Sequence, residues 1–174
     1  MTHRHDSFAA DDGATRERLI DYARQLGATI GERSGEVVAA TFPDFESIVD
    51  WCTFAALDGA EYCPPLVRLA LDLGTPERVH AWMQAHIEWR DEPGERLSAP
   101  SSTLKRGWGD CDDHAVLETS MISALGFPAA VVALTLDGEP THAATLAELA
   151  RDDWWWFDST EPGSKRPYMA GAKT

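Results

Sequence analysis

Residues 107–115 read GWGDCDDHA, and the interpretation of the whole chain begins from this stretch. Its two glycines permit a tight backbone approach, and Asp110 is of a residue type that favours the N-cap of a helix. We therefore expect a helix from Cys111 to Leu125. A cysteine at the start of a helix lies at the positive end of the helix dipole, which favours the thiolate over the thiol. The stretch thus indicates a nucleophilic cysteine.

Three β-strands are expected after this helix. Gly126 ends the helix, and the apolar run 129–136 is typical of a strand buried on both faces. A turn at residues 137–140 leads to a second strand over 142–149, and a third strand covers 154–160. The three strands predict a small antiparallel sheet against which the cysteine-bearing helix packs.

Two further residues of this sheet are candidates for the same chemistry. A nucleophilic thiolate needs a histidine to move protons and a partner that fixes the tautomer of that histidine. His142 begins the second strand, and Asp158 lies in the WWWFDST segment of the third. If the register sum is even, both side chains lie on one face of the sheet, directly opposed or one cross-strand step apart. Their Cβ atoms are then about 5 to 8 Å apart, which is within hydrogen-bonding reach.

The first half of the chain has the pattern of a helical region. Residues 1–14 are polar and are expected to form a flexible leader, whereas apolar residues recur at helical spacing from Thr15 to a stop at Gly27. Further helices are expected over 44–57, with Gly59 beyond the end, over 64–73, and from Thr75 as N-cap with an apolar face reaching Trp89. The connection at residues 91–110 is long enough to be functional or disordered. The sequence thus predicts an α+β fold with a helical N-terminal half.

Composition narrows the class of protein. A chain of 174 residues suits one domain, and 44% hydrophobic residues make a buried core feasible. The net charge of -14 argues against binding nucleic acid or an acidic membrane surface. The sequence has neither an apolar run of the roughly 20 residues that span a bilayer nor a secretory signal, so we expect a soluble, cytoplasmic protein. Cys52, Cys63 and Cys111 cannot all pair within the chain, and the first two are expected to be buried.

The order of these segments resembles the transglutaminase-like superfamily of papain-type cysteine enzymes. The resemblance runs from Thr75 to Pro162, and it rests on GDCDDHA at 109–115, THAATLAEL at 141–149 and WWWFDSTEP at 154–162. It implies a papain-like core in which Cys111 is the nucleophile, His142 the general base and acid, and Asp158 the orienting carboxylate. The family's strand often reads His, an aliphatic and then an aromatic residue. Here it reads HAAT, which implies a smaller substrate groove.

The same resemblance implies acyl transfer on amide bonds through a thioester, by a peptidase, an amidase or a transglutaminase. It divides the chain into a leader (1–14), a helical N-terminal region (15–74), a catalytic core (75–162) and a tail (163–174) that is expected to fray. The partner is then a protein or peptide substrate. The backbone N–H of Cys111 is a natural oxyanion donor because helix N-termini present unpaired amides. The indole of Trp108 is a tentative second donor, with ordinary packing as its alternative.

Less specific roles are open for several of these residues. A cysteine in an apolar helix is often only packed, and a non-catalytic binding module in a phage or bacterial assembly is the alternative function. Asp112 and Asp113 are expected to favour the helix dipole while opposing the thiolate. His114 is placed for a zinc site, but a structural site takes four ligands and no CxxC or HxxxH motif accompanies it. We therefore expect no metal and no cofactor.

Two groups of aromatic side chains have competing interpretations. Trp154, Trp155 and Trp156 line a substrate cleft in one interpretation, and in the other they fill a core and cover a helix, as alternating tryptophans in strands more often do. His80 and His86, on the helix that starts after Thr75, are expected at the surface or partly packed. Glu118 lies on the same helix face as Cys111, and the sequence suggests no role for it.

Overall fold

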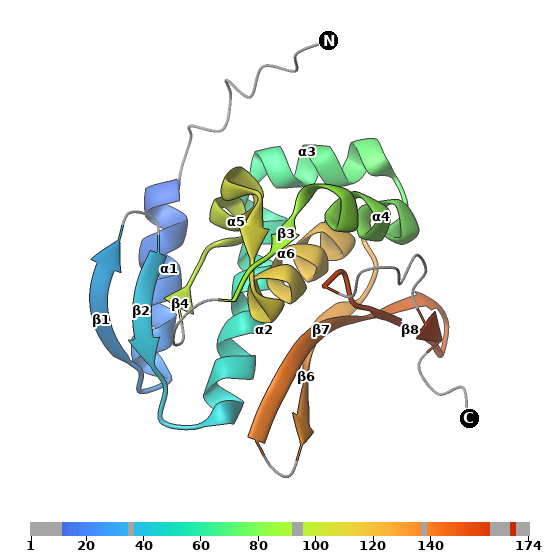
Figure 1. The fold of residues 1–174 in the computed structure, drawn as a ribbon. Helices are drawn as coiled ribbons and strands as arrows, with labels where there is room; N and C mark the ends of the chain where they lie inside the picture. The colour runs from blue at the N-terminus through green and yellow to red at the C-terminus, as the bar shows by residue number, and fades with distance from the viewer. Residues whose placement is uncertain (1–11, 35–36, 92–95, 137–138, 161–167, 170–174) are drawn as a thin grey trace.

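Helix α6 (Cys111–Ala124) lies between a sheet and a group of helices (Figure 1). The structure, a computed structural model, describes residues 12–34, 37–91, 96–136, 139–160 and 168–169. On one side of α6 lies an antiparallel sheet in the order β6-β7-β8-β9. On the other side lie three helices, and a fourth, α2, runs along its flank. The fold is α+β, as the sequence predicts.

The helices and strands of the structure lie close to the bounds that the sequence predicts, except where noted below. The sheet consists of β6 (Ala129–Leu136), β7 (Glu139–Ala150), β8 (Asp153–Phe157) and β9 (Tyr168–Met169). The helices are α1 (Asp12–Gln25), α2 (Phe45–Tyr62), α3 (Pro64–Leu73), α4 (Pro76–His86) and α5 (Pro100–Arg106). Of the regions expected to be a leader, a turn and a tail, residues 1–11, 137–138, 163–167 and 170–174 lie outside the described residues. Residues 12–14 belong to α1, and Tyr168–Met169 pairs with β8, so these two parts of the prediction were wrong.

Capping explains where two of the helices begin. Thr75 caps α4 by accepting the backbone N–H of Arg78 at 3.3 Å, with Pro76 in the first helical position. Asp44, expected inside α2, instead caps it, because its carboxylate accepts the N–H of Ser47 at 2.8 Å. The sequence places Trp89 on α4, but the helix ends at His86 and Trp89 lies in β3 (Glu88–Trp89) with its side chain exposed.

Helix α2 continues past Gly59, where the sequence predicts that it has already ended. Gly59 is buried inside the helix, and a Cβ there would lie 2.7 Å from Cγ of Pro100 and 2.9 Å from Oγ of Ser120. Glycine is thus required for the close approach of α2 to α5 and α6, not to stop the helix. The prediction failed because close packing and helix termination select the same residue type.

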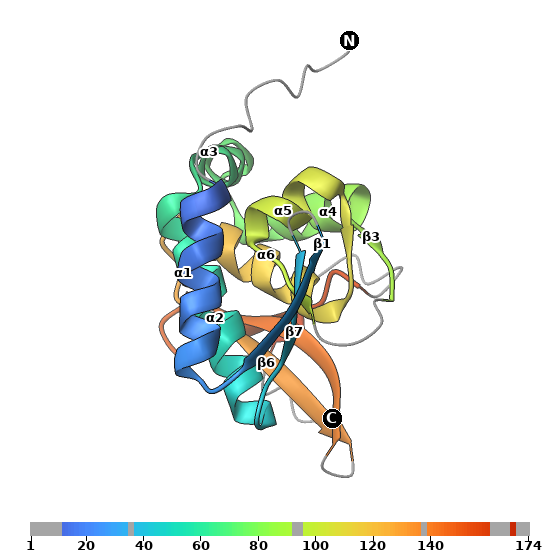
Figure 2. The same ribbon diagram turned by 90° about the vertical axis from the view of Figure 1, so that its left-hand side faces the viewer.

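The N-terminal half is not wholly helical. Strands β1 (Thr29–Ser34) and β2 (Val37–Thr41) form an antiparallel pair, and β4 (Arg96–Leu97) adds to β2. Figure 2 shows β1 beside α1 on the side of the molecule that faces the viewer. The segment VVAAT at 37–41 contains β-branched residues that favour a strand, and Gly35 precedes it as a turn signal. The helical prediction for residues 15–74 missed this hairpin.

The connection at 91–110 is largely structured, contrary to the expectation of a long loop. It contains β4, α5 and β5 (Trp108–Gly109), and β5 pairs in parallel with β3. Residues 92–95 lie outside the described residues. Because α5 and β5 contact α6, the connection delivers Cys111 to a fixed position.

The first strand of the main sheet is an edge strand. Residues 129–136 form β6 with the predicted bounds, but β6 pairs only with β7 in this sheet, and Leu134 is 46% exposed. The expectation of burial on both faces was therefore wrong. Strand β6 is apolar although it is an edge strand, because α2 covers part of it.

Helix α6 is buried along most of its length. Every residue from Asp113 to Ile122 is buried, with Ala115 and Val116 in one apolar cluster and Leu117, Met121 and Ile122 in another. The helix therefore joins two cores, which holds its first residue rigidly. Within the described ranges, no helix has the length and apolar character needed to cross a membrane.

A buried polar pair corrects the expectation for one histidine. His80 is 1% exposed, and its Nδ1 lies 2.8 Å from Oε1 of Glu118 on α6. The pair joins α4 to α6 and gives Glu118 a role, whereas His86 is exposed as expected. The sequence held a signal for this pair: His80 and Glu118 are each a polar residue on the apolar face of a helix. Buried polar groups are normally paired with one another.

Candidate active site

Cys111 is the first residue of α6 and is partly buried. Burial raises the pKa of its thiol to about 11, and the carboxylates of Asp112 and Asp110 act in the same direction. The backbone N–H groups of Ala143 and Asp112 donate hydrogen bonds to the sulfur and oppose this shift. The sequence predicts a lowered pKa from the helix dipole alone. In the structure burial of the thiol raises the pKa instead, so the resting cysteine is a neutral thiol.

His142 and Asp158 form the pair that the strand register predicts. Nε2 of His142 lies 2.6 Å from Oδ2 of Asp158. Thr145 of β7 pairs with Phe157 of β8, so the next residue, Asp158, falls one cross-strand step from His142 on the same face. The carboxylate therefore fixes the tautomer in which Nε2 carries the proton, and Nδ1 remains as the basic nitrogen.

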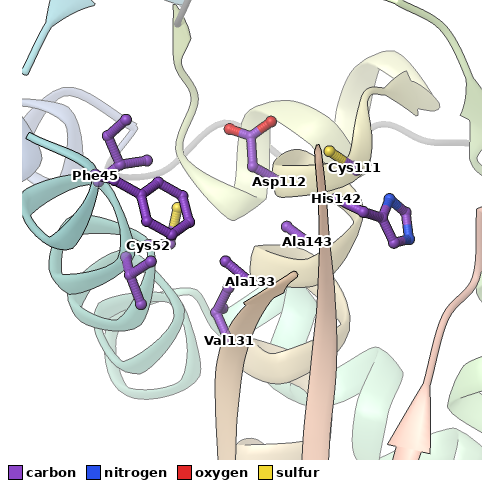
Figure 3. Close-up of a pocket in the computed structure, with 10 residues that line it drawn as sticks. Phe45, Cys52, Cys111, Asp112, Val131, Ala133, His142 and Ala143 are labelled. Atoms are coloured by element: carbon purple, nitrogen blue, oxygen red, sulfur yellow. The ribbon is translucent and has the colours of Figure 1, made fainter. Parts of the chain in front are cut away.

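The structure brings the cysteine and the histidine to one pocket. Cys111 and His142 both line it, and Figure 3 shows the sulfur and the imidazole at the same end. Ala143, the residue after His142, donates its backbone N–H to the sulfur. Strand β7 thus contacts the thiol directly, and the three predicted residues converge from α6, β7 and the end of β8.

The segment that carries Asp158 is held by residues that sequence reasoning did not single out. Oδ1 of Asp158 accepts hydrogen bonds from the backbone N–H of Thr160 at 3.1 Å and from its hydroxyl at 2.6 Å. Oγ of Ser159 lies 3.0 Å from Nδ1 of His114, one turn along α6 from Cys111. The sequence FDST contained the signal, because Asp, Ser and Thr side chains bond to nearby backbone in turns.

His114 links the nucleophile helix to this segment. Burial lowers its pKa, while the Glu88 carbonyl and the Asp158 and Asp110 carboxylates act in the opposite direction and His142 acts with burial. His114 is therefore neutral at physiological pH and serves as a hydrogen-bonding group. The described part of the chain contains no cluster of three or more His, Cys, Asp or Glu residues placed to hold a metal ion.

A threonine fixes the position of β7 on α6. Thr145 is fully buried, and its hydroxyl donates to the carbonyl of Ala115 at 3.1 Å and lies 2.9 Å from the hydroxyl of Thr119. Ala115 lies one turn after Cys111, and Thr145 lies three residues after His142. This contact therefore fixes the position of the His142 imidazole on β7 relative to the Cys111 thiol on α6.

A profile of the Transglutaminase-like superfamily matches residues 70–159, which is 90 of the 174 residues. The chain belongs to this superfamily. No curated protein sequence matches the chain.

Two solved structures are similar to this chain at low sequence identity. A protein from Cytophaga hutchinsonii, described as a "putative cysteine protease", has 20% identity, a TM-score of 0.50 and coverage of 74% of this chain. This chain spans 48% of that protein. Calcium-bound LapG of Legionella pneumophila has 16% identity and a TM-score of 0.46, with coverage of 91% of this chain and 78% of that one. At these identities the likeness concerns the fold alone.

The superfamily segment before Cys111 is anchored by Asp113. This carboxylate is buried, forms an ion pair with Arg106 and accepts the hydroxyl hydrogen bond of Thr103 at 3.1 Å. A Cβ at Gly109 would lie 2.5 Å from the Cβ of Asp113, so the glycine permits this close approach. Asp113 thus does more than favour the dipole. Asp110 occupies the N-cap position but makes no capping hydrogen bond, contrary to the expectation for it.

The tryptophans lie outside the pocket. The ring of Trp108 is flanked by the guanidinium groups of Arg106 at 4.5 Å and Arg90 at 5.3 Å, and it is not among the residues that line the pocket. Its role as an oxyanion donor stays a prediction. Trp155 packs against the second core, and Trp154 lines a separate surface pocket. None of the tryptophans of 154–156 lines the pocket beside Cys111, and the interpretation as core packing is confirmed for Trp155.

Helix α2 supplies a wall of the pocket from outside the matched superfamily segment. Its residues Phe45, Ile48, Val49 and Cys52 face Val131 and Ala133 of β6 and Ala143 of β7 (Figure 3). Cys52 and Cys63 are buried as expected. Besides the thiol of Cys52, the polar side chains among the lining residues are those of Cys111, Asp112 and His142.

Proposed function

We propose that this protein is a cysteine-dependent enzyme that cleaves amide bonds through a thioester, with Cys111 as nucleophile, His142 as base and acid, and Asp158 as the orienting carboxylate. The observation that carries the proposal is the arrangement of the three residues. Asp158 holds Nε2 of His142 at 2.6 Å, and His142 shares a pocket with the thiol. A nucleophile, a base and a group that orients the base are the parts that such catalysis requires.

Acylation follows from the protonation states. Because the pKa of Cys111 is raised to about 11, the thiol loses its proton to Nδ1 of His142 as the sulfur attacks the amide carbonyl. The C–S bond forms, and the carbonyl oxygen becomes an oxyanion. Nδ1 then gives the proton to the leaving nitrogen, the C–N bond breaks, and the amine departs. Asp158 stabilises the imidazolium that forms in between.

The oxyanion needs donors that are in place before the reaction. The backbone N–H of Cys111 lies in the first turn of α6, where helix amides have no intrahelical acceptor. A donor of this kind stabilises the developing charge in a pocket from which water is partly excluded. We propose this amide as the first oxyanion donor.

Deacylation completes the cycle. A water molecule gives its proton to Nδ1 of His142 and attacks the thioester, the C–S bond breaks, and the sulfur recovers the proton. With water as the acceptor the protein is a peptidase or amidase. With an amine as the acceptor it is a transglutaminase.

One observation favours the alternative of a non-catalytic protein-binding module. The raised pKa of Cys111 leaves little thiolate at neutral pH, as in a cysteine that is only packed. The alternative predicts that His142 has no influence on the reactivity of the sulfur.

The activated ester p-nitrophenyl acetate tests the proposal without knowledge of the natural substrate. We expect one equivalent of p-nitrophenolate to be released in a burst, with an acetyl group on the peptide that contains Cys111. Cys111→Ala abolishes the burst, and His142→Ala slows it by about 100-fold or more. Added cadaverine distinguishes the acceptors, because amine transfer yields N-acetylcadaverine. A burst that survives Cys111→Ala, or no acylation of Cys111, contradicts the proposal.

A further inference from the structure

The pocket beside Cys111 is polar at one end only. Cys111, Asp112 and His142 lie together at that end, whereas the walls consist of apolar side chains from α2 and β6 (Figure 3). A substrate that places its carbonyl at the sulfur therefore has apolar surface beside that carbonyl. Burial of apolar surface is favourable, and burial of an unpaired charge is costly.

The size of the pocket limits what it accepts. Its volume is about 150 Å³. Apolar cavities of about this volume hold a benzene molecule. A side chain of the size of leucine or phenylalanine fits this space, whereas an indole is larger than the benzene ring that cavities of this volume hold.

One wall of the pocket, the one supplied by α2, lies outside the part of the chain that matches the superfamily. Ile48 and Val49 lie on α2, outside residues 70–159, and they face Ala133 of the edge strand β6. The small side chain of Ala133 leaves the space open. The selectivity of the site is thus determined by the packing of α2 against β6.

We infer that this pocket receives the side chain of the residue whose carbonyl is attacked, and that the substrates are amides of residues with leucine-sized to phenylalanine-sized apolar side chains. The inference rests on the proposed function, because it places the attacked carbonyl at Cys111. Charged side chains are disfavoured because the walls are apolar, and Asp112 beside Cys111 further repels acidic ones.

Peptidyl chloromethyl ketones test this selectivity directly. The sulfur displaces chloride and forms a C–S bond, so the probe reports on the side chain next to the ketone. The panel carries Leu, Phe, Trp, Asp or Lys at that position on one common peptide. Rates of adduct formation at Cys111, measured by peptide mass spectrometry, are divided by the iodoacetamide rate of the same variant. This correction removes differences in thiol reactivity.

We expect the Leu and Phe probes to react about tenfold or more faster than the Trp, Asp and Lys probes. Ala133→Leu fills the pocket and reduces the rates of the Leu and Phe probes toward those of the others. Ile48→Ala enlarges it and raises the rate of the Trp probe. Leu134→Ala, at an exposed neighbouring position of the same strand, keeps the wild-type order of probes.

The outcomes separate the two proposals. Equal rates for all probes, or an unchanged order in both Ala133→Leu and Ile48→Ala, overturn the pocket assignment and leave the proposed chemistry standing. If no probe modifies Cys111 while iodoacetamide does, the proposed function is overturned and the pocket assignment with it.

Discussion

Asp158 lies one cross-strand step from His142 on the same face of the sheet, and 2.6 Å separates its Oδ2 from Nε2 of the imidazole. Asp158→Asn keeps the size of the side chain but removes the charge that stabilises the imidazolium. We expect acylation by p-nitrophenyl acetate to slow by about 100-fold or more. Asp153→Asn, at the start of β8 and away from the histidine, is the matched control. Equal rates in the two variants would show that Asp158 does not orient His142.

Thr145 is predicted to matter for both stability and rate. Thr145→Val leaves the hydroxyl of Thr119 without this partner inside the protein, so we expect a loss of about 1–2 kcal/mol in the free energy of unfolding. Because Thr145 also holds β7 against Ala115, acylation of Cys111 slows as well. Urea denaturation and burst kinetics measure the two effects. Thr145→Ser retains the hydroxyl and restores the acylation rate, and a Ser variant as slow as the Val variant contradicts the positioning role.

His114 is predicted to make the free energy of unfolding depend on pH under acidic conditions. Burial lowers its pKa below the ordinary 6.5, so below that pH the unfolded chain binds a proton that the folded protein does not. The folded state is then destabilised as the pH falls, by no more than about 1.4 kcal/mol per pH unit. Urea denaturation of the wild type and of His114→Gln over this range measures the difference. We expect a shallower dependence in the variant, and parallel curves would contradict the assignment.

Cys111 is predicted to lower the folding stability as the pH rises under alkaline conditions. Its pKa is raised from 9.0 to about 11, so between these values the unfolded thiol has lost its proton and the folded one has kept it. Folding stability therefore decreases as the pH rises through this range. Comparison with Cys111→Ser isolates the contribution, because lysines and tyrosines titrate in both proteins. A wild type that loses no more stability than the variant contradicts the raised pKa.

The half of the chain that carries the candidate site was predictable because its signals are local and independent. The capping pattern and the apolar period placed α6 within one residue of its true end, and β6 has the predicted bounds. Strand periodicity placed His142 and Asp158 on one face on condition that the register sum is even, and the observed pairing of Thr145 with Phe157 meets that condition. The superfamily resemblance then assigned roles to the same residues that the spacing had selected.

The remaining features depend on tertiary contacts that have no local pattern. Gly59 allows α2 to pack closely against α5 and α6, but in the sequence it cannot be distinguished from a glycine that ends a helix. His80 is buried because Glu118 approaches from another helix 38 positions away. The raised pKa of Cys111 arises mainly from burial of the thiol in the folded protein, which no local sequence pattern reports. The contribution of α2 to the pocket could not be predicted either, because it depends on a tertiary contact that leaves no local sequence pattern.

The central claim is that His142 withdraws the proton from Cys111, and the alkylation rate of Cys111 by iodoacetamide as a function of pH tests it most directly. In the wild type we predict alkylation near neutral pH that is about tenfold or more faster than in His142→Ala, with the two rates converging above about pH 11, where the thiol ionises unaided. Identical rate profiles for the two proteins across the whole range would contradict the account, since the imidazole would then have no influence on the sulfur.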